Sequence, residues 1–230
     1  MKATLQFRIK SFFCFLTLIF FFTSATAQDI YVSSSTGSDV TGNGTEANPY
    51  ATIQTGVDSA AVGNNILVMD GVYSGEGNYN ITFGGKDLTI SANGPDFCTI
   101  DIDSAAHPAF IFDQGETSAS VISGFKIINC EDYAIRLQAY DDYPSAVIEN
   151  LMITDCYGGI HVAGNDSTGF GSAPAIHNCL IKFNSTDGIY IGNYCNADVF
   201  NNTIFGNGGY GISIDNADNA ILYNNIVQGN

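Results

Sequence analysis

Tryptophan is absent from the 230 residues, and proline (five) and methionine (three) are scarce. Basic side chains are the more informative shortage, because seven Lys and Arg face 23 Asp and Glu, a formal net charge of −16. Binding to nucleic acids and to anionic membrane surfaces requires clustered Lys and Arg. The sequence therefore predicts no nucleic-acid partner and no attachment to an anionic membrane surface.

The residues that are present favour a folded chain rich in turns. Apolar residues make up 45% and charged residues 13%, which is not the balance of a disordered polyanion. Glycine occurs 25 times, above its usual share of about 7%. The length admits one domain or two.

An export signal is predicted at residues 1–27. Three basic residues lie in the first ten positions, Phe12–Phe22 is almost wholly apolar, and Ala25-Thr26-Ala27 has the pattern of a cleavage site. The apolar run is too short to span a bilayer comfortably, so a cleaved signal is favoured over an uncleaved anchor. We expect a secreted or cell-surface protein with no membrane span after cleavage. Residues 28–230 then hold four basic and all 23 acidic residues, a charge of −19.

The sequence repeats itself from about residue 120. Five segments share a six-residue pattern that begins and ends on an aliphatic residue, and their first residues lie 26, 28, 23 and 22 positions apart. Apolar residues alternate with a period of two, which is typical of strands. Such spacing is typical of one coil of a parallel β-solenoid, whose coils stack about 4.8 Å apart. The segments begin at Ile122, Ile148, Ile176, Val199 and Ile221.

A second strand is predicted in four of these repeats, centred on an isoleucine 12 or 13 residues after the first anchor. Equivalent side chains of stacked coils form ladders. We therefore expect these isoleucines to lie in line and to face the core. They are Ile135, Ile160, Ile189 and Ile212.

The third position of the repeat is predicted to form a tight bend between two strands. It holds Gly124, Asn150, Asn178, Asn201 and Tyr223. Glycine and asparagine tolerate the left-handed backbone conformation that such a bend requires. We interpret the asparagine run as structural rather than as a binding site.

Five cysteines follow the predicted signal, and no C-x-x-C pair occurs, so a structural zinc site is not expected. Cys130 and Cys156 share the ninth position of neighbouring repeats and are predicted to be adjacent. Export permits a disulfide between them, and free cysteine also packs as a small apolar residue. The sequence favours a stacked thiol pair and leaves the disulfide open.

The N-terminal part is predicted to cap the solenoid. A strand is predicted at Asp29–Val32, and apolar residues over Tyr50–Val62 have the spacing of a helix. One helix before a series of strands is suited to cover the exposed first coil of a solenoid. We expect a cap over 28–64 and a parallel β-helix over 65–230. The sequence stops at Asn230 midway through a coil, so we expect a fragment, incomplete at the C-terminus. Further strands are predicted at Ile66–Met69, Ile81–Phe83, Leu88–Ser91, Thr99–Ile102 and Phe110–Phe112.

Five motifs follow one another near the N-terminus: Asp29-Ile-Tyr-Val-Ser33, Thr36-Gly-Ser-Asp39, Gly44-Thr45, Asn48-Pro-Tyr-Ala-Thr-Ile-Gln54 and Asn65-Ile-Leu-Val-Met-Asp-Gly-Val-Tyr73. With the later repeats, they resemble secreted β-helix proteins of the pectate-lyase-like superfamily, including family nine polysaccharide lyases and uncharacterised bacterial surface proteins. The resemblance implies an all-β, right-handed single-stranded parallel β-helix with a short N-terminal capping helix; the handedness also follows the general crossover rule. It implies no single activity, because the fold hosts lyases, hydrolases, epimerases and non-enzymatic adhesins.

The middle residue of each second strand is predicted to point away from the core. Arg136, His161, Tyr190 and Ser213 hold this position, and four rungs about 4.8 Å apart span roughly 14 Å, enough for two or three sugar units. Arginine pairs with carboxylates, and histidine transfers protons near neutral pH. Arg136 and His161 are catalytic candidates, and all four are candidate substrate-binding residues. The alternative is an ordinary solvated face.

Longer connections enter only after the second strand, as is usual when one face of a solenoid carries the function. Aromatic side chains in these loops are candidates for sugar binding: Tyr140, Tyr143, Phe170 and Tyr194. Acidic side chains are candidates for a Ca²⁺ site: Asp141, Asp142, Asp166 and Asp215, with Asp218 in the last loop. Polar loops with part-buried aromatic residues are the alternative.

The resemblance implies a β-elimination in which Ca²⁺ neutralises a uronate carboxylate and Lys or Arg takes the C5 proton. No predicted outward ladder combines stacked Asp with Lys86, Lys126, Arg136 or Lys182, and no opposed carboxylate pair for a glycoside hydrolase can be placed. The leading hypothesis is a module that binds extracellular polysaccharide. If it is catalytic, we expect a uronate-type polysaccharide lyase. Ca²⁺ is the one cofactor that the resemblance implies. The alternative is a non-catalytic adhesin or structural repeat protein.

Overall fold

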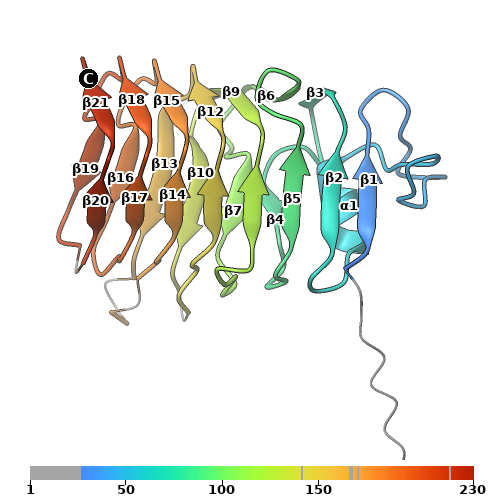
Figure 1. Cartoon of the computed structure of the whole chain (residues 1–230), viewed down its shortest axis with the longest axis horizontal. Coiled ribbons are helices and arrows are strands. Elements are labelled where there is room, and N and C mark those ends of the chain that lie inside the picture. Colours follow the sequence, from blue (N-terminus) through green and yellow to red (C-terminus); the bar gives the residue numbers. More distant parts are fainter. Residues whose placement is uncertain (1–26, 141, 166–167, 170, 218) are drawn as a thin grey trace, which may run out of the picture.

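The computed structural model describes residues 27–230 except 141, 166, 167, 170 and 218. The chain winds as a right-handed parallel β-solenoid through three sheets, passing in each coil from the eight-stranded to the seven-stranded to the six-stranded sheet (Figure 1). The predicted all-β parallel β-helix is confirmed. The predicted export signal lies outside the described residues, apart from residue 27.

The strands are short, and all pair in parallel. The eight-stranded sheet consists of β1 (Asp29–Val32), β2 (Asn65–Val68), β5 (Thr89–Ala92), β8 (Val121–Ser123), β11 (Val147–Glu149), β14 (Ala175–His177), β17 (Asp198–Phe200) and β20 (Ile221–Tyr223). The seven-stranded sheet consists of β3 (Gly71–Ser74), β6 (Cys98–Ala105), β9 (Lys126–Cys130), β12 (Met152–Thr154), β15 (Leu180–Lys182), β18 (Thr203–Phe205) and β21 (Ile226–Gln228). The six-stranded sheet consists of β4 (Ile81–Thr82), β7 (Phe110–Phe112), β10 (Tyr133–Gln138), β13 (Gly158–Ala163), β16 (Ile189–Ile191) and β19 (Ile212–Ile214).

Aliphatic ladders fill the core. Ile135 pairs in register with Ile160, Ile160 with Ile189, and Ile189 with Ile212, and the first three are fully buried. The predicted isoleucine ladder is confirmed. Because side chains alternate across a strand, the residue that follows each of these isoleucines faces outward.

The left-handed bends are confirmed in four coils and corrected in the fifth. Positive φ occurs at Gly124, Asn150, Asn178 and Asn201. In the last coil the bend is at Asn224 (φ 54°) and not at Tyr223, because Leu222 rather than Ile221 pairs with Val199. Two adjacent aliphatic residues left the hydrophobic pattern ambiguous by one position. Asparagine, which tolerates the left-handed conformation, decides the register.

An inward ladder of amides and thiols occupies another corner of the coil. Asn184 Nδ2 donates to Asn207 Oδ1 (2.9 Å), and Asn207 Nδ2 donates to Asn230 Oδ1 (2.7 Å). On the preceding rungs Cys156 and Cys130 are buried free thiols, and their mutual hydrogen bond and burial raise the pKa of Cys130. In-register rungs about 4.8 Å apart exceed the Cβ–Cβ separation that a disulfide prefers. The favoured thiol pair is therefore what the structure contains.

The capping helix α1 (Ile53–Ser59) is shorter than the predicted Tyr50–Val62. It begins after Thr52, the N-cap residue, and ends before Ala60, whose backbone is extended. Asp39 sets the start, because its carboxylate accepts the Thr52 N–H (3.1 Å) and holds that residue outside the helix. Apolar residues continue at helical spacing beyond both ends of α1, so the spacing did not indicate where the helix begins and ends.

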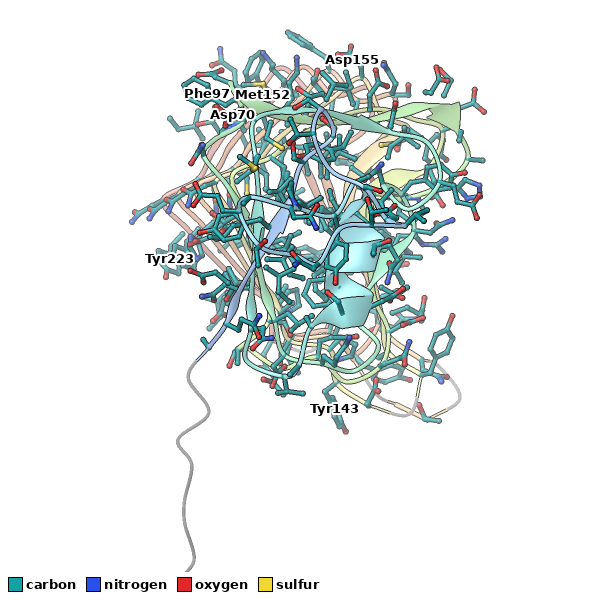
Figure 2. All side chains as sticks on the ribbon, turned by 90° about the vertical axis from the view of Figure 1, so that its right-hand side faces the viewer. Asp70, Phe97, Tyr143, Met152, Asp155 and Tyr223 are labelled. Atoms are coloured by element: carbon teal, nitrogen blue, oxygen red, sulfur yellow. The ribbon has the colours of Figure 1, made fainter. Side chains whose placement is uncertain are left out.

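Helix α1 covers the free edge of β4. The side-chain amide of Gln54 bonds to both the N–H (3.0 Å) and the C=O (3.2 Å) of Thr82, and Lys86 Nζ donates to the carbonyls of Val57 and Ala60 at the helix end. Figure 2, which looks along the solenoid, shows α1 across its N-terminal end. Within the described residues, no helix is long and apolar enough to cross a membrane.

Candidate functional site

The outward residues of the six-stranded sheet form one row. Arg136 pairs with His161, His161 with Tyr190, and Tyr190 with Ser213. Each is partly exposed and stands between inward-facing residues of its own strand. The predicted alignment of these residues is confirmed, and we call this row the outer strip.

The imidazole of His161 lies between two tyrosine rings. Its centroid is 4.8 Å from that of Tyr133 and 5.0 Å from that of Tyr190, with interplanar angles of 29° and 28°. Tyr133 pairs with Gly158 of the next coil, where a Cβ would lie 2.4 Å from the tyrosine ring. Glycine thus leaves room for Tyr133 to lean over the next rung and reach His161. Tyr133 was not predicted as a site residue, and the glycine opposite it is the sequence signal that could have indicated it.

Arg136 carries the positive charge of the strip. Its Nη1 lies 3.2 Å from Asp132 Oδ2 in an ion pair. Burial lowers the pKa of His161, and the Arg136 charge lowers it further, while Asp132 opposes both. The imidazole is therefore neutral at neutral pH and has one nitrogen able to accept a proton. Asp132 was not predicted as a site residue either, because it lies in the bend before β10.

The far end of the strip is polar and is bordered by exposed rings. Tyr190 Oη donates to Asp215 Oδ2 (3.3 Å), and Asp187 Oδ1 accepts the Tyr210 N–H (2.7 Å). Tyr210 is 71% exposed, and Tyr157, 48% exposed, meets Tyr133 edge-on at 5.7 Å. Asp187, Tyr210 and Tyr157 were not predicted as site residues from the repeat pattern.

The edge loops follow the strands of the six-stranded sheet. Tyr140 and Tyr143 are exposed, and Tyr194 is partly buried. The carbonyl of Tyr140 accepts from Asn165 Nδ2 (2.7 Å), which joins two successive loops. Figure 2 places Tyr143 at the end of the cross-section farthest from Asp155. The remaining predicted loop residues, Phe170, Asp141, Asp166 and Asp218, lie outside the described residues.

The two described Ca²⁺ candidates are not neighbours. Asp142 packs over Gly115 of the preceding coil, where an added Cβ would lie 3.0 Å from its Oδ2. Asp215 bonds to Tyr190 in a loop three coils further on, roughly 14 Å along the axis. In the described part of the chain, no three His, Cys, Asp or Glu residues lie close enough to hold an ion together.

The lysines considered as lyase bases lie away from the strip. Lys86 caps α1, and Lys182 lies over the rings of Phe183 and Phe205 at 5.6 and 6.0 Å. Lys126 begins β9 in the seven-stranded sheet. Arg136 is therefore the basic residue that the structure places in the outer strip.

The family model for the right-handed beta helix region matches residues 109–230. Among solved structures, the chain resembles the catalytic domain of a GH87 α-1,3-glucanase in complex with nigerose (15% identity, TM-score 0.58), covering 71% of this chain and 30% of the other. It also resembles a rhamnogalacturonan lyase (18%, TM-score 0.52), covering 86% and 62%. A further match is pectate lyase Pel9A (15%, TM-score 0.46), covering 80% and 55%.

No curated protein matches the chain. At these identities the structural matches show the fold alone. The chain spans less than a third of the glucanase domain and under two thirds of the rhamnogalacturonan lyase.

Proposed function

The chain belongs to the right-handed β-helix family, and on that basis we propose that it is a secreted or cell-surface module that binds extracellular polysaccharide along the outer strip. The observation that carries the proposal is the outward row in which the His161 imidazole lies between two tyrosine rings next to Arg136. Aromatic rings with polar tips suit ligands that have both apolar and polar surfaces. The glucanase and the rhamnogalacturonan lyase support a polysaccharide as the ligand class.

The catalytic form of this proposal is a β-elimination on a uronate chain. Arg136 is a poor base because its guanidinium stays protonated, and it is instead suited to bind the uronate carboxylate. Neutral His161 accepts the C5 proton. The C5–H electrons form the C4–C5 double bond, the bond from C4 to the glycosidic oxygen breaks, and that oxygen takes a proton from water.

The acidic residues of the edge loops are the only Ca²⁺ ligands that the proposal names. The described carboxylates do not fit an ion by themselves, because Asp142 and Asp215 lie in loops three coils apart. The other predicted ligands, Asp141, Asp166 and Asp218, lie outside the described residues. Calorimetric titration with CaCl₂ should give a binding heat that Asp142→Asn abolishes; no heat with the unaltered chain removes Ca²⁺ from the proposal.

The second candidate is a non-catalytic adhesin or structural repeat protein. The Arg136–Asp132 ion pair favours it, because the cation of the strip is already neutralised by the protein itself. Incubation with polygalacturonate and Ca²⁺, followed by absorbance of the unsaturated product, separates the two candidates. Product formation supports the lyase form, and binding without product supports a non-catalytic binding protein.

Variants test the strip itself. His161→Gln should abolish any product formation while leaving binding measurable, and Tyr190→Ala should weaken binding at least tenfold in affinity electrophoresis. His107→Gln is the matched control, since His107 also stacks on a tyrosine, Tyr79 at 4.9 Å, outside the strip. Equal effects of the control and the strip variants would remove the strip from the proposal.

For export, protein recovered from culture medium should begin at Gln28.

A further inference from the structure

A groove of about 540 Å³ runs along the corner between the eight-stranded and seven-stranded sheets. One wall consists of the bend residues Asn150, Asn178 and Asn201, and the other includes the first residues of β12, β15 and β18. Those first residues are Met152, Leu180 and Thr203, which pair in register. Figure 2 places Met152 at a corner of the cross-section away from Tyr143, which marks the loop end.

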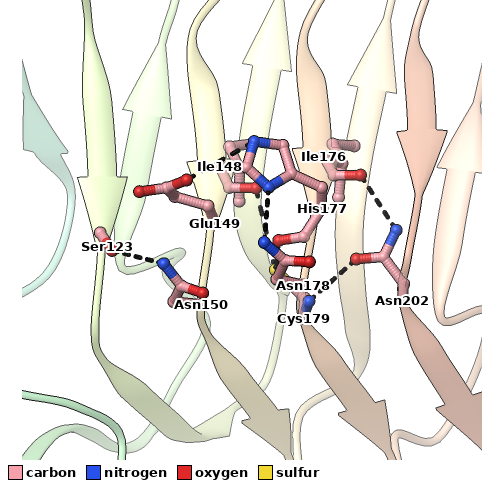
Figure 3. A network of polar contacts seen from close by, with 9 residues as sticks. All are labelled: Ser123, Ile148, Glu149, Asn150, Ile176, His177, Asn178, Cys179 and Asn202. Atoms are coloured by element: carbon pink, nitrogen blue, oxygen red, sulfur yellow. Dashed lines mark hydrogen bonds and ion pairs between the residues drawn. The ribbon is translucent and has the colours of Figure 1, made fainter.

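The amides of the groove are held from the protein side. Asn150 Nδ2 donates to Ser123 Oγ (3.2 Å), and Asn178 Nδ2 lies 3.1 Å from His177 Nδ1 (Figure 3). His177 is in turn 3.5 Å from Glu149. Within the described residues, the carbonyl oxygens of these two amides accept no protein hydrogen bond. They remain available to a ligand.

The bend itself does not require asparagine. Gly124 holds the same position one coil earlier, with φ 86°. Asparagine in the next three coils thus adds an amide at every rung, about 4.8 Å apart. The structural interpretation of the run explains the backbone conformation and these side-chain contacts, but it gives no role to the carbonyl oxygens of the Asn150 and Asn178 amides.

Among the described residues, the groove lining contains no Asp, Glu, Lys or Arg, in a chain with 23 acidic residues. An amide both donates and accepts, as a hydroxyl group does, and Met152 and Leu180 offer apolar surface to the C–H groups of a sugar. An extended peptide advances about 3.3 Å per residue and alternates its side chains, which does not match rungs about 4.8 Å apart. We propose that this corner groove binds an uncharged linear polysaccharide lying along the solenoid axis, as a site separate from the outer strip.

The test compares a triple variant with an outer-strip variant. Asn150→Gly, Asn178→Gly and Asn201→Gly together remove the amides and keep the left-handed bends, as Gly124 does naturally. Affinity electrophoresis in a soluble β-1,3-glucan and in hydroxyethylcellulose should show at least a tenfold loss of affinity for one of these polymers. Tyr190→Ala should retain that affinity.

Leu180→Asp is the second variant, and it should cause a similar loss by placing a charge in the apolar wall. Circular dichroism and thermal melting verify that each variant is folded at the assay temperature. Unchanged binding by the triple variant overturns the proposal, as does the absence of binding to either neutral polymer or tighter binding to polygalacturonate. Loss in Tyr190→Ala alone rejects the groove and leaves the proposal for the outer strip standing.

Discussion

Glu116 is fully buried in the connection between β7 and β8, the only acidic residue so placed in the described part of the chain. Its carboxylate accepts the N–H groups of Gln114 (3.1 Å) and Gly85 (3.3 Å). Burial raises its pKa, and the charge of Asp113 adds to this, while the backbone hydrogen bonds oppose it. The folded chain therefore holds a proton on Glu116 more tightly than the unfolded chain does.

This shift predicts a specific pH dependence of stability. Because the native pKa lies above the ordinary 4.5, the contribution of Glu116 is fully present below that value and is lost as pH rises through the native pKa. Melting temperatures of the wild type and of Glu116→Gln, measured from about pH 4 to pH 8, should diverge in favour of the variant as pH rises. A constant difference across this range would contradict the assignment, whatever its absolute size.

His161 gives a second prediction at the same scale. Burial and the Arg136 charge lower its pKa below the ordinary 6.5. In Arg136→Gln the pKa of His161 should rise, because a repelling charge is removed while Asp132 remains. An NMR titration of the histidine ring protons measures this shift, with Lys182→Gln as a control that removes a cation elsewhere. An unchanged His161 titration would mean that burial alone sets its pKa.

At this scale the sequence identified the outward positions but not their partners. Arg136, His161 and Tyr190 follow from the strand alternation. Tyr133 and Asp132 precede the second strand, where the chain turns between two sheets and the period of two does not hold. Their contacts depend on side-chain directions across neighbouring coils, which a single repeat does not contain.

Buried amide ladders connect one coil to the next. Asn207 Oδ1 accepts both the backbone N–H (3.1 Å) and the Nδ2 (2.9 Å) of Asn184, and Asn207 Nδ2 donates to the Ile181 carbonyl (3.3 Å). Asn202 and Asn225 repeat the arrangement at another corner. Each such asparagine satisfies polar groups that would otherwise be buried without partners.

Asn207→Ala should therefore destabilise the chain strongly. It leaves two donors of Asn184 buried without an acceptor, at about 1–3 kcal/mol each, so the free energy of unfolding should fall by roughly 2–6 kcal/mol. Urea denaturation measures this change. Asn201→Gly is the matched control, since it alters an exposed asparagine and preserves the bend. A loss no larger than that of the control would show that the ladder does not contribute as described.

At the level of elements, strands were predicted correctly where apolar and polar residues alternate, because that alternation marks an inward and an outward face. The strand β3 was missed because Gly71 at its start is typical of a turn, yet Tyr73 within it is fully buried and bonds to the carbonyls of Val32 and Met69. The helix boundaries were missed because Asp39, far back in the sequence, sets the start of α1. Both errors come from contacts between distant residues.

For the whole molecule, stacking explains why the fold was predictable and much of the site was not. Each coil repeats the core position of the one before, so the isoleucine ladder is readable from spacing alone. The edge loops repeat neither in length nor in sequence, and nothing in them indicates which carboxylates meet. Asp142 and Asp215 looked equivalent in sequence, yet they contact different coils.

Net charge gives the last prediction. Residues 28–230 carry four basic and 23 acidic side chains, and the single cation of the outer strip is paired with Asp132, with Asp187 and Asp215 nearby. Polygalacturonate is itself an anion, so its approach is opposed at long range. Raising NaCl from about 0.01 M to about 0.1 M shortens the screening length from about 30 Å to about 10 Å, which should strengthen polygalacturonate binding several-fold and leave neutral glucan binding unchanged. Weaker polygalacturonate binding at higher salt would mean that pairing with Arg136 outweighs the repulsion from the whole molecule.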